Sequence, residues 1–238
     1  MEYKEIVEGE FIARPNRFIA EVIINNKLET VHVKNTGKCK ELLVPGAKVY
    51  LEVCEDPKRK TKYDLVMVEK AKDLDCEPLL INMDSQVPNK VVLEFLRNGT
   101  LFGEVSPTRI RPETTYGKSR FDFYVEVENR KIFLEVKGVT LEENSRALFP
   151  DAKTLRGVKH VEELIASMKE GYEAYILFLI QMKGPVIFLP NDATHLQFGD
   201  ALRRAKQEGV KILAFDSEVW KKGIRIGKEL PVDLEQKV

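Results

Sequence analysis

Apolar and polar residues follow two different patterns along the chain, and the pattern changes near residue 82. Before that point, short alternating runs are separated by turn signals such as Asn25-Asn26 and Pro45-Gly46. These runs predict about five short strands, over residues 10–13, 17–24, 28–33, 48–54 and 63–68. Short strands at this spacing indicate a small β-barrel, of which the OB-fold is one option.

After residue 82, helical and strand patterns alternate. The apolar spacing predicts a helix between an N-cap at Thr154 and a stop at Gly171, further helices over 91–96 and 196–208, and strands over 105–113, 120–127, 131–139, 174–180 and 210–215. The run Ala174–Ile180 is apolar throughout, as expected of a strand buried on both faces. This order indicates an α/β domain with a mixed sheet, so that the whole chain is α+β. We therefore expect two domains, 1–82 and 83–238.

Composition limits the class of protein. The 38 Lys and Arg residues balance 38 Asp and Glu residues, and this neutrality at first disfavours a nucleic-acid partner, since such proteins are usually basic. No apolar run is long enough to cross a membrane, and the charged segment Met1–Glu5 lacks a signal-peptide core. We therefore expect a cytoplasmic protein without membrane contact. Cys39, Cys54 and Cys76 lack the spacing of a disulfide framework or a zinc site.

Residues 120–137 carry the most informative pattern. If Glu128-Asn129 forms a two-residue turn, Phe123 opposes Leu134 and Asp122 opposes Glu135. In that register one face is apolar, with Phe121, Phe123, Val125, Ile132, Leu134 and Val136, and the other carries Asp122, Glu135 and Lys137. A slip of one residue would spoil this pattern. The alternation therefore selects the register that brings the two carboxylates together.

Two carboxylates that face each other across strands, with Cβ atoms about 5 Å apart, destabilise a sheet unless a positive group lies between them. A divalent metal, Mg²⁺ or Mn²⁺, is one such group, with Asp122 and Glu135 as ligands and Lys137 reaching a water or a phosphate beside it. These are the parts needed to attack a phosphodiester. The alternative is a solvent-facing hairpin in which Lys137 neutralises Glu135, because such spacings also arise by chance.

Asp122 together with Glu135-Val136-Lys137 resembles the motif of the PD-(D/E)xK nuclease superfamily, although Phe121 stands where the motif has proline. The chain also resembles the SfsA, or sugar fermentation stimulation protein, family through a series of short motifs: Asn35-Thr36-Gly37, 42–46, 116–117, 119–123, 135–137, 149–152 and 156–160. This resemblance implies an N-terminal OB-like domain that binds DNA, a C-terminal domain like that of restriction endonucleases, and contacts to the backbone of single- or double-stranded DNA.

The family resemblance also suggests roles for several other residues. Glu113 is either a third metal ligand or a surface residue paired with Arg111, and we expect His160 to be a supporting hydrogen-bond partner. Phe18 and Tyr63 are aromatic residues that either stack on bases or pack in the core. The candidate DNA contacts are Lys38, Lys40, Arg59, Arg109, Arg111, Arg120, Arg156 and Lys159. Because these cations cluster locally, overall neutrality does not exclude a basic groove.

The resulting prediction is a DNA-binding protein whose metal site hydrolyses phosphodiester bonds, with Asp122, Glu135 and Lys137 as catalytic residues. The alternative is a non-enzymatic DNA-binding regulator of sugar (maltose) metabolism genes, and a homodimer is left open. A glycosidase is disfavoured, since Lys137 tends to keep both acids ionised, whereas such enzymes need one protonated carboxyl.

Overall fold

The structure, a computed structural model, describes residues 1–35, 37–71, 77–99, 101–103, 105–117 and 119–236. The chain folds into two compact units. The first contains Met1–Val87 and the returning segments Gln181–Gly184 and Ser217–Arg225, and the second contains Pro88–Ile180, Pro185–Asp216 and the chain from Ile226 onward. The units thus divide after Val87 and not at residue 82, and the chain crosses back twice. Thr36 and Cys76 lie outside the described residues.

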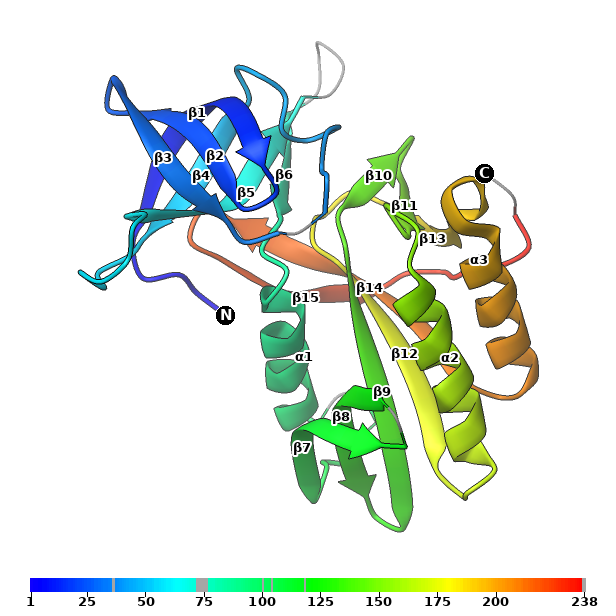
Figure 1. Ribbon diagram of the computed structural model, residues 1–238. Helices are drawn as coiled ribbons and strands as arrows, with labels where there is room; N and C mark the ends of the chain where they lie inside the picture. Colours follow the sequence, from blue (N-terminus) through cyan, green and yellow to red (C-terminus); the bar gives the residue numbers. More distant parts are fainter. Residues whose placement is uncertain (36, 72–76, 100, 104, 118, 237–238) are drawn as a thin grey trace. The chain divides into compact units, whose positions relative to one another are not determined.

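The first unit is built on a closed barrel, which confirms the small barrel expected from the sequence (Figure 1). Its strands are β1 (Ile6–Asn16), β2 (Ile19–Ile24), β3 (Lys27–Val33), β4 (Lys48–Val53) and β5 (Tyr63–Lys70), to which β6 (Leu79–Asn82) adds at one edge. The strands follow the order β3-β2-β1-β4-β5, and β3 pairs with β5 in parallel to close the ring. The predicted hairpin turn at Asn25 and Asn26 is present, with φ of 50° and 61°.

The second unit contains a mixed sheet, as expected, in the order β15-β14-β12-β9-β8-β7. Its strands are β7 (Arg109–Tyr116), β8 (Ser119–Val127), β9 (Arg130–Val139), β12 (Glu173–Ile180), β14 (Lys211–Trp220) and β15 (Gly223–Glu229), although residues 217–225, which end β14 and begin β15, belong to the first unit. Strand β12 runs parallel to both neighbours, β9 and β14, whereas the β7-β8-β9 meander is antiparallel. A small second sheet joins β10 (Leu141–Glu143), β11 (Arg146–Phe149) and β13 (Ile187–Pro190).

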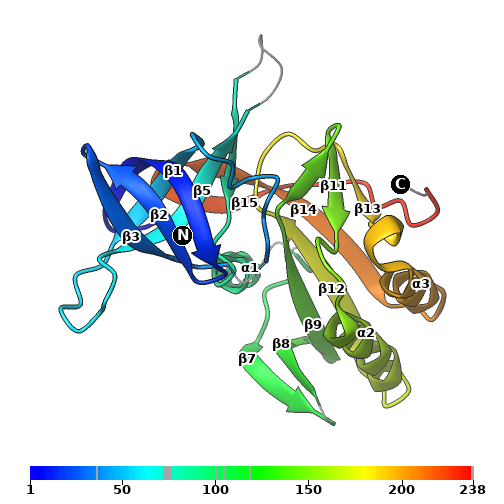
Figure 2. The ribbon, with the colours of Figure 1, turned by 45° about the horizontal axis from the view of Figure 1, so that its top comes forward.

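Helices cover both faces of the main sheet, with α1 (Val87–Arg97) on one side and α2 (Leu155–Met168) and α3 (Asp192–Gln207) on the other (Figure 2). Phe95 of α1 packs against Phe215 of β14, while Phe178 of β12 contacts Phe198 of α3. Strand β12 is therefore buried from both sides, which explains its uninterrupted apolar sequence. Helix α2 begins after the predicted N-cap Thr154, whose side chain accepts from the backbone N–H of Gly157 at 3.0 Å.

Among the residues that the structure describes, no helix is both long enough and apolar enough to span a membrane.

Candidate active site

The β8-β9 hairpin adopts the predicted register over most of its length. Val127 pairs with Arg130, and Phe123 pairs with Leu134. The side chains of Phe123, Val125, Ile132 and Leu134 are buried, so the expected apolar face forms on this part of the hairpin. Turn position and alternation were therefore sufficient to align the two strands.

The hairpin departs from the prediction at Asp122, because the β8-β9 ladder ends at the Phe123–Leu134 pair. The backbone N–H of Val136 donates instead to Asp122 Oδ2, at 2.8 Å. The expectation that Phe121 shares a face with Phe123 is wrong, since its ring lies 5.0 Å from that of Phe133, on the opposite face. The neighbouring strand is irregular at the same level, where Glu113 of β7 has a φ of 52°.

Asp122 is held by two hydrogen bonds from different elements. Its Oδ1 accepts from Nδ2 of Asn89 in the first turn of α1, and its Oδ2 accepts from the backbone N–H of Val136, both at 2.8 Å. Burial, together with the nearby negative charge of Glu135, raises the pKa of Asp122. The two carboxyl groups therefore interact electrostatically, although they do not form a pair in the strand ladder.

Glu135 is almost completely buried and uses one oxygen for all its contacts. Its Oε1 accepts from Lys137 Nζ and from His160 Nδ1. Burial alone would raise the pKa of Glu135, but the hydrogen bond from His160 and the charge of Lys137 outweigh burial and lower it. Its Oε2 is buried and has no hydrogen-bond partner among the described residues. An unpartnered buried polar oxygen lowers the stability of the fold by roughly 1–3 kcal/mol. Such an atom is rare in native proteins and is typical of a site where a ligand supplies the missing partner.

His160 of α2 lies between Glu135 and Arg156. The Nε of Arg156 donates to His160 Nε2 at 3.3 Å. Because arginine can only donate, Nε2 of the ring is the acceptor and Nδ1 carries the proton that is donated to Glu135. His160 thus has the supporting role that the sequence suggested. Asn89, which has the same role for Asp122, was missed, since an asparagine in the first turn of a helix carries no signal for a contact this distant in sequence.

A basic pocket of about 440 Å³ adjoins His160. The turn between β7 and β8 and the first turns of α2 line it, with Thr115, Gly117, Ser119, Arg120, Arg156, Lys159 and His160. Three of the predicted DNA contacts, Arg120, Arg156 and Lys159, therefore come together beside Glu135, where they can bind phosphate oxygens.

The remaining predicted residues of this domain lie along β7. Glu113 is largely exposed and pairs with Arg120, at 3.4 Å, rather than with Arg111. Arg109 pairs with Glu126 at 3.5 Å, and Arg111 is exposed. Within the described ranges, no three His, Cys, Asp or Glu side chains converge as a group that could hold a metal ion. The role of Glu113 as a third ligand stays a prediction.

The predicted contacts of the barrel differ from one another in their surroundings. Lys38 and Lys40 are exposed and line a second pocket, described below. The guanidinium of Arg59 instead forms two hydrogen bonds to the buried Asp64, at 2.9 and 2.5 Å. Arg59 thus stabilises the interior of the barrel through Asp64, in addition to any role at its surface.

Comparisons with known proteins agree with this architecture. The family model of the sugar fermentation stimulation protein RE domain matches residues 86–223, and that of the SfsA N-terminal OB domain matches residues 12–76. The chain is 53% identical to a sugar fermentation stimulation protein homolog of Ruminiclostridium cellulolyticum, over 98% of this chain and 100% of the relative. It is 55% identical to a homolog of Desulfitobacterium hafniense, over 98% and 99% of the two chains.

A solved structure has the same fold along the whole chain. It is that of Pyrococcus furiosus SfsA in complex with Ca²⁺, which is 27% identical, covers 98% of each chain and superposes with a TM-score of 0.85. The chain therefore belongs to the SfsA family, with an N-terminal OB domain and a C-terminal RE domain like that of restriction endonucleases.

Proposed function

We propose that this protein is a divalent-metal-dependent nuclease that acts on DNA, with Asp122 and Glu135 as ligands of Mg²⁺ or Mn²⁺. The observation that carries the proposal is the buried Oε2 of Glu135, which has no hydrogen-bond partner among the described residues. Lys137 contacts the other oxygen of this carboxylate, and the negative charge of Glu135 acts on Asp122. Mg²⁺ commonly binds one or two carboxylates and completes its octahedron with water and substrate phosphate. These two acids therefore fit the metal without a third carboxylate.

The Pyrococcus furiosus relative supports a divalent ion, since it was solved in complex with Ca²⁺. Ca²⁺ and Mg²⁺ both take hard oxygen ligands such as carboxylates, so a site that holds one often accepts the other. When bound, the metal supplies a nucleophilic water and neutralises charge that develops on the phosphate.

The chain's own residues have separate tasks in this proposal. The ammonium group of Lys137 donates hydrogen bonds to the scissile phosphate or to the attacking water, while Glu135 fixes its position. His160 orients Glu135, and Asn89 orients Asp122, so that both carboxylates are already in place before substrate arrives. Arg120, Arg156 and Lys159 bind neighbouring phosphates of the DNA backbone.

The test is cleavage of single- and double-stranded DNA with Mn²⁺ by the wild type and by Asp122→Asn and Glu135→Gln. These variants keep the size of each side chain but remove its charge, and we expect cleavage to be lost in both. Glu128→Gln, in the exposed hairpin turn, is the matched control and should keep full activity.

A second readout is independent of turnover. Titration with Mn²⁺, followed by electron paramagnetic resonance, should show one tight site in the wild type and in Glu128→Gln and a weakened site in Glu135→Gln. If the wild type binds DNA but cleaves no substrate form and also binds no Mn²⁺, the nuclease proposal is contradicted. That result favours the non-enzymatic regulator.

A further inference from the structure

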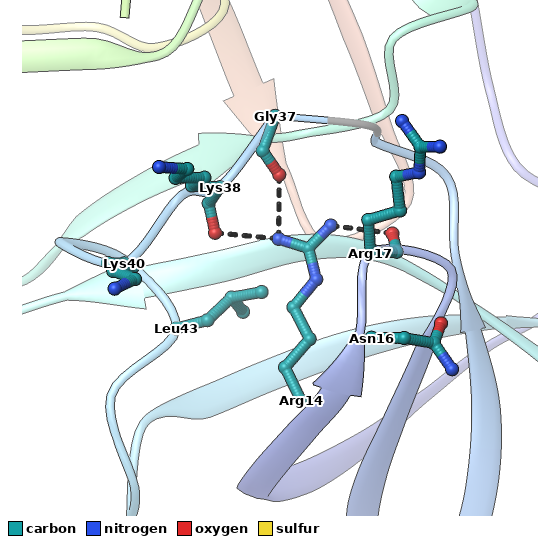
Figure 3. Close-up of a pocket in the computed structure, with 7 residues that line it drawn as sticks. All are labelled: Arg14, Asn16, Arg17, Gly37, Lys38, Lys40 and Leu43. Carbon is teal, nitrogen blue, oxygen red and sulfur yellow. Dashed lines mark hydrogen bonds between the residues drawn. The ribbon is translucent and has the colours of Figure 1, made fainter. Parts of the chain in front are cut away.

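The OB domain contains a pocket of its own, of about 430 Å³, which lies within the first unit (Figure 3). The turn between β1 and β2 forms one wall, and the segment after β3 forms the other. The lining residues are Arg14, Asn16, Arg17, Gly37, Lys38, Lys40 and Leu43. Only Lys38 and Lys40 of these were expected from the sequence to contact DNA. Four of the seven residues are cationic, and none is acidic.

These four cations keep their charge available for a ligand. Within the part of the chain that the structure describes, none of them forms an ion pair with a carboxylate. Arg14 donates instead to the backbone carbonyls of Asn35, Lys38, Arg17 and Gly37, at distances of 2.6 to 2.8 Å. Figure 3 shows its guanidinium between both walls. Because carbonyl groups are neutral, Arg14 fixes the two walls without cancelling the positive field of the pocket.

An exposed aromatic ring stands at the edge of this pocket. Phe18 follows Arg17, and its side chain is 47% exposed. The guanidinium of Arg17 lies 5.0 Å from the centroid of this ring. Asn16 Oδ1 accepts from the backbone N–H groups of Phe18 and Ile19, at 2.9 and 3.1 Å, which holds the turn in shape. A large ring in such a rigid, exposed turn contributes little to the core, and it presents a flat apolar face beside unpaired cations.

We infer that this pocket binds single-stranded nucleic acid, with a backbone phosphate among Arg17, Lys38 and Lys40 and a base stacked on Phe18. Unpaired cations that track phosphates and an exposed ring that stacks on a base are the two elements that single-strand binding sites combine. A duplex keeps its bases stacked inside the helix and cannot offer one to Phe18. The inference rests on the proposed function only in taking DNA as the ligand, and it specifies that the barrel engages an unpaired strand.

The experiment measures binding of the full chain to labelled oligothymidylate of about 12 nucleotides, a length within the usual range for an OB domain. Fluorescence anisotropy is recorded with a chelator present, so that no cleavage occurs. The key variant is Phe18→Ala, with Leu28→Ala as the matched control, because Leu28 is also on the barrel surface and is 63% exposed. Since stacking contributes about 1–3 kcal/mol per base, Phe18→Ala should weaken binding roughly 5- to 150-fold. Phe18→Trp should restore it.

Charge is tested separately from stacking. Lys38→Ala and Lys40→Ala should each weaken binding and lower the slope of log K against log salt by about 0.7, while the exposed control Lys27→Ala should not. An abasic oligomer of equal length should bind weakly and should not respond to Phe18→Ala. Inorganic phosphate should compete only at high concentration, because it lacks the base.

Three results would overturn the inference. The first is equal binding by Phe18→Ala and Leu28→Ala. The second is equal affinity for abasic and normal strands. The third is displacement of the oligomer by inorganic phosphate at low concentration, which would make the pocket a site for free anions. Cleavage with Mn²⁺ that persists alongside any of these results leaves the nuclease proposal intact. Conversely, barrel-dependent binding by a chain that never cleaves contradicts only the nuclease proposal.

Discussion

His160 donates through Nδ1 to the same oxygen of Glu135 that Lys137 contacts, and so the other oxygen of this buried carboxylate has no hydrogen-bond partner in the part of the chain that the structure describes. Two donors on one oxygen orient the carboxylate firmly, because the group cannot rotate without breaking both bonds. The free oxygen is thereby held in a fixed direction. In the proposed metal site, such an arrangement preorganises Glu135 as a ligand.

Removing the imidazole should therefore weaken metal binding without removing a ligand. We expect His160→Ala to lower the affinity for Mn²⁺ and the rate of cleavage by roughly 10- to 100-fold, since Glu135 loses one of its two orienting donors. His160→Asn places an amide donor near the former Nδ1 and should recover part of the loss. Mn²⁺ titration of both variants checks this. Unchanged metal affinity in His160→Ala would show that Lys137 alone positions the carboxylate.

Asn89 should have the equivalent role for Asp122. Asn89→Ala removes the donor to Asp122 Oδ1 and leaves a half-buried carboxylate with only the Val136 N–H. We expect a loss of about 1 kcal/mol in the free energy of unfolding, together with weaker Mn²⁺ binding. Chemical denaturation with and without Mn²⁺ measures both effects. Asn98→Ala, at an exposed position just after α1, is the control and should change neither.

The sequence was sufficient to predict the hairpin that carries the acids, but not the surroundings of those acids. Alternation and a two-residue turn determine the register at Phe123 and Leu134, because every other register would expose apolar side chains. The same rule fails at Phe121, since it assumes an uninterrupted ladder. The interruption lies opposite Glu113, which has a positive φ. A glycine at this position would have suggested a positive φ from the sequence, whereas a glutamate does not.

Contacts between segments distant in sequence could likewise not be predicted from the sequence pattern. Asn89 reaches Asp122 from another element, and Arg14 reaches carbonyls of the segment after β3. Such contacts depend on how the elements pack, which local periodicity does not encode. The cations Lys38 and Lys40 could be proposed from charge alone, but their shared pocket with Arg14 and Arg17 became visible only in the fold.

The barrel should lose stability in acid through Asp64. Burial alone would raise the pKa of Asp64, but hydrogen bonds from Arg59 and His32 and the charge of Lys34 outweigh burial and lower it well below its usual range. A carboxyl whose pKa is lower in the folded than in the unfolded state binds its proton more readily when unfolded. It therefore stabilises the fold at pH values above the unfolded pKa of about 3.9, and this contribution disappears as pH falls through the folded pKa.

Asp64→Asn should accordingly cost roughly 2–4 kcal/mol near pH 7, and the difference from the wild type should shrink steadily below about pH 4. The fluorescence of Trp220, the single tryptophan, reports on unfolding of this unit, to which it belongs. The exposed Asp56→Asn serves as the control. A gap between Asp64→Asn and the wild type that stays constant down to pH 2 would contradict the assigned role of the charge.

The pocket beside His160 allows substrate binding to be separated from positioning of Glu135. Lys159 lines the pocket and pairs with Glu163 on the same helix, at 3.6 Å, whereas Arg156 lines the same pocket and donates to His160. We expect Lys159→Ala to raise KM and to lower the salt slope of duplex binding by about 0.9, with unchanged Mn²⁺ affinity.

Arg156→Ala should show the same loss of phosphate binding and, in addition, a lower kcat and weaker Mn²⁺ binding, since His160 loses its donor. Salt-dependent anisotropy, steady-state kinetics and Mn²⁺ titration on the two variants distinguish these patterns. Lys169→Ala, an exposed lysine at the far end of α2, is the control for net charge. If both pocket variants change only KM, the hydrogen bond from Arg156 to His160 has no part in organising the site.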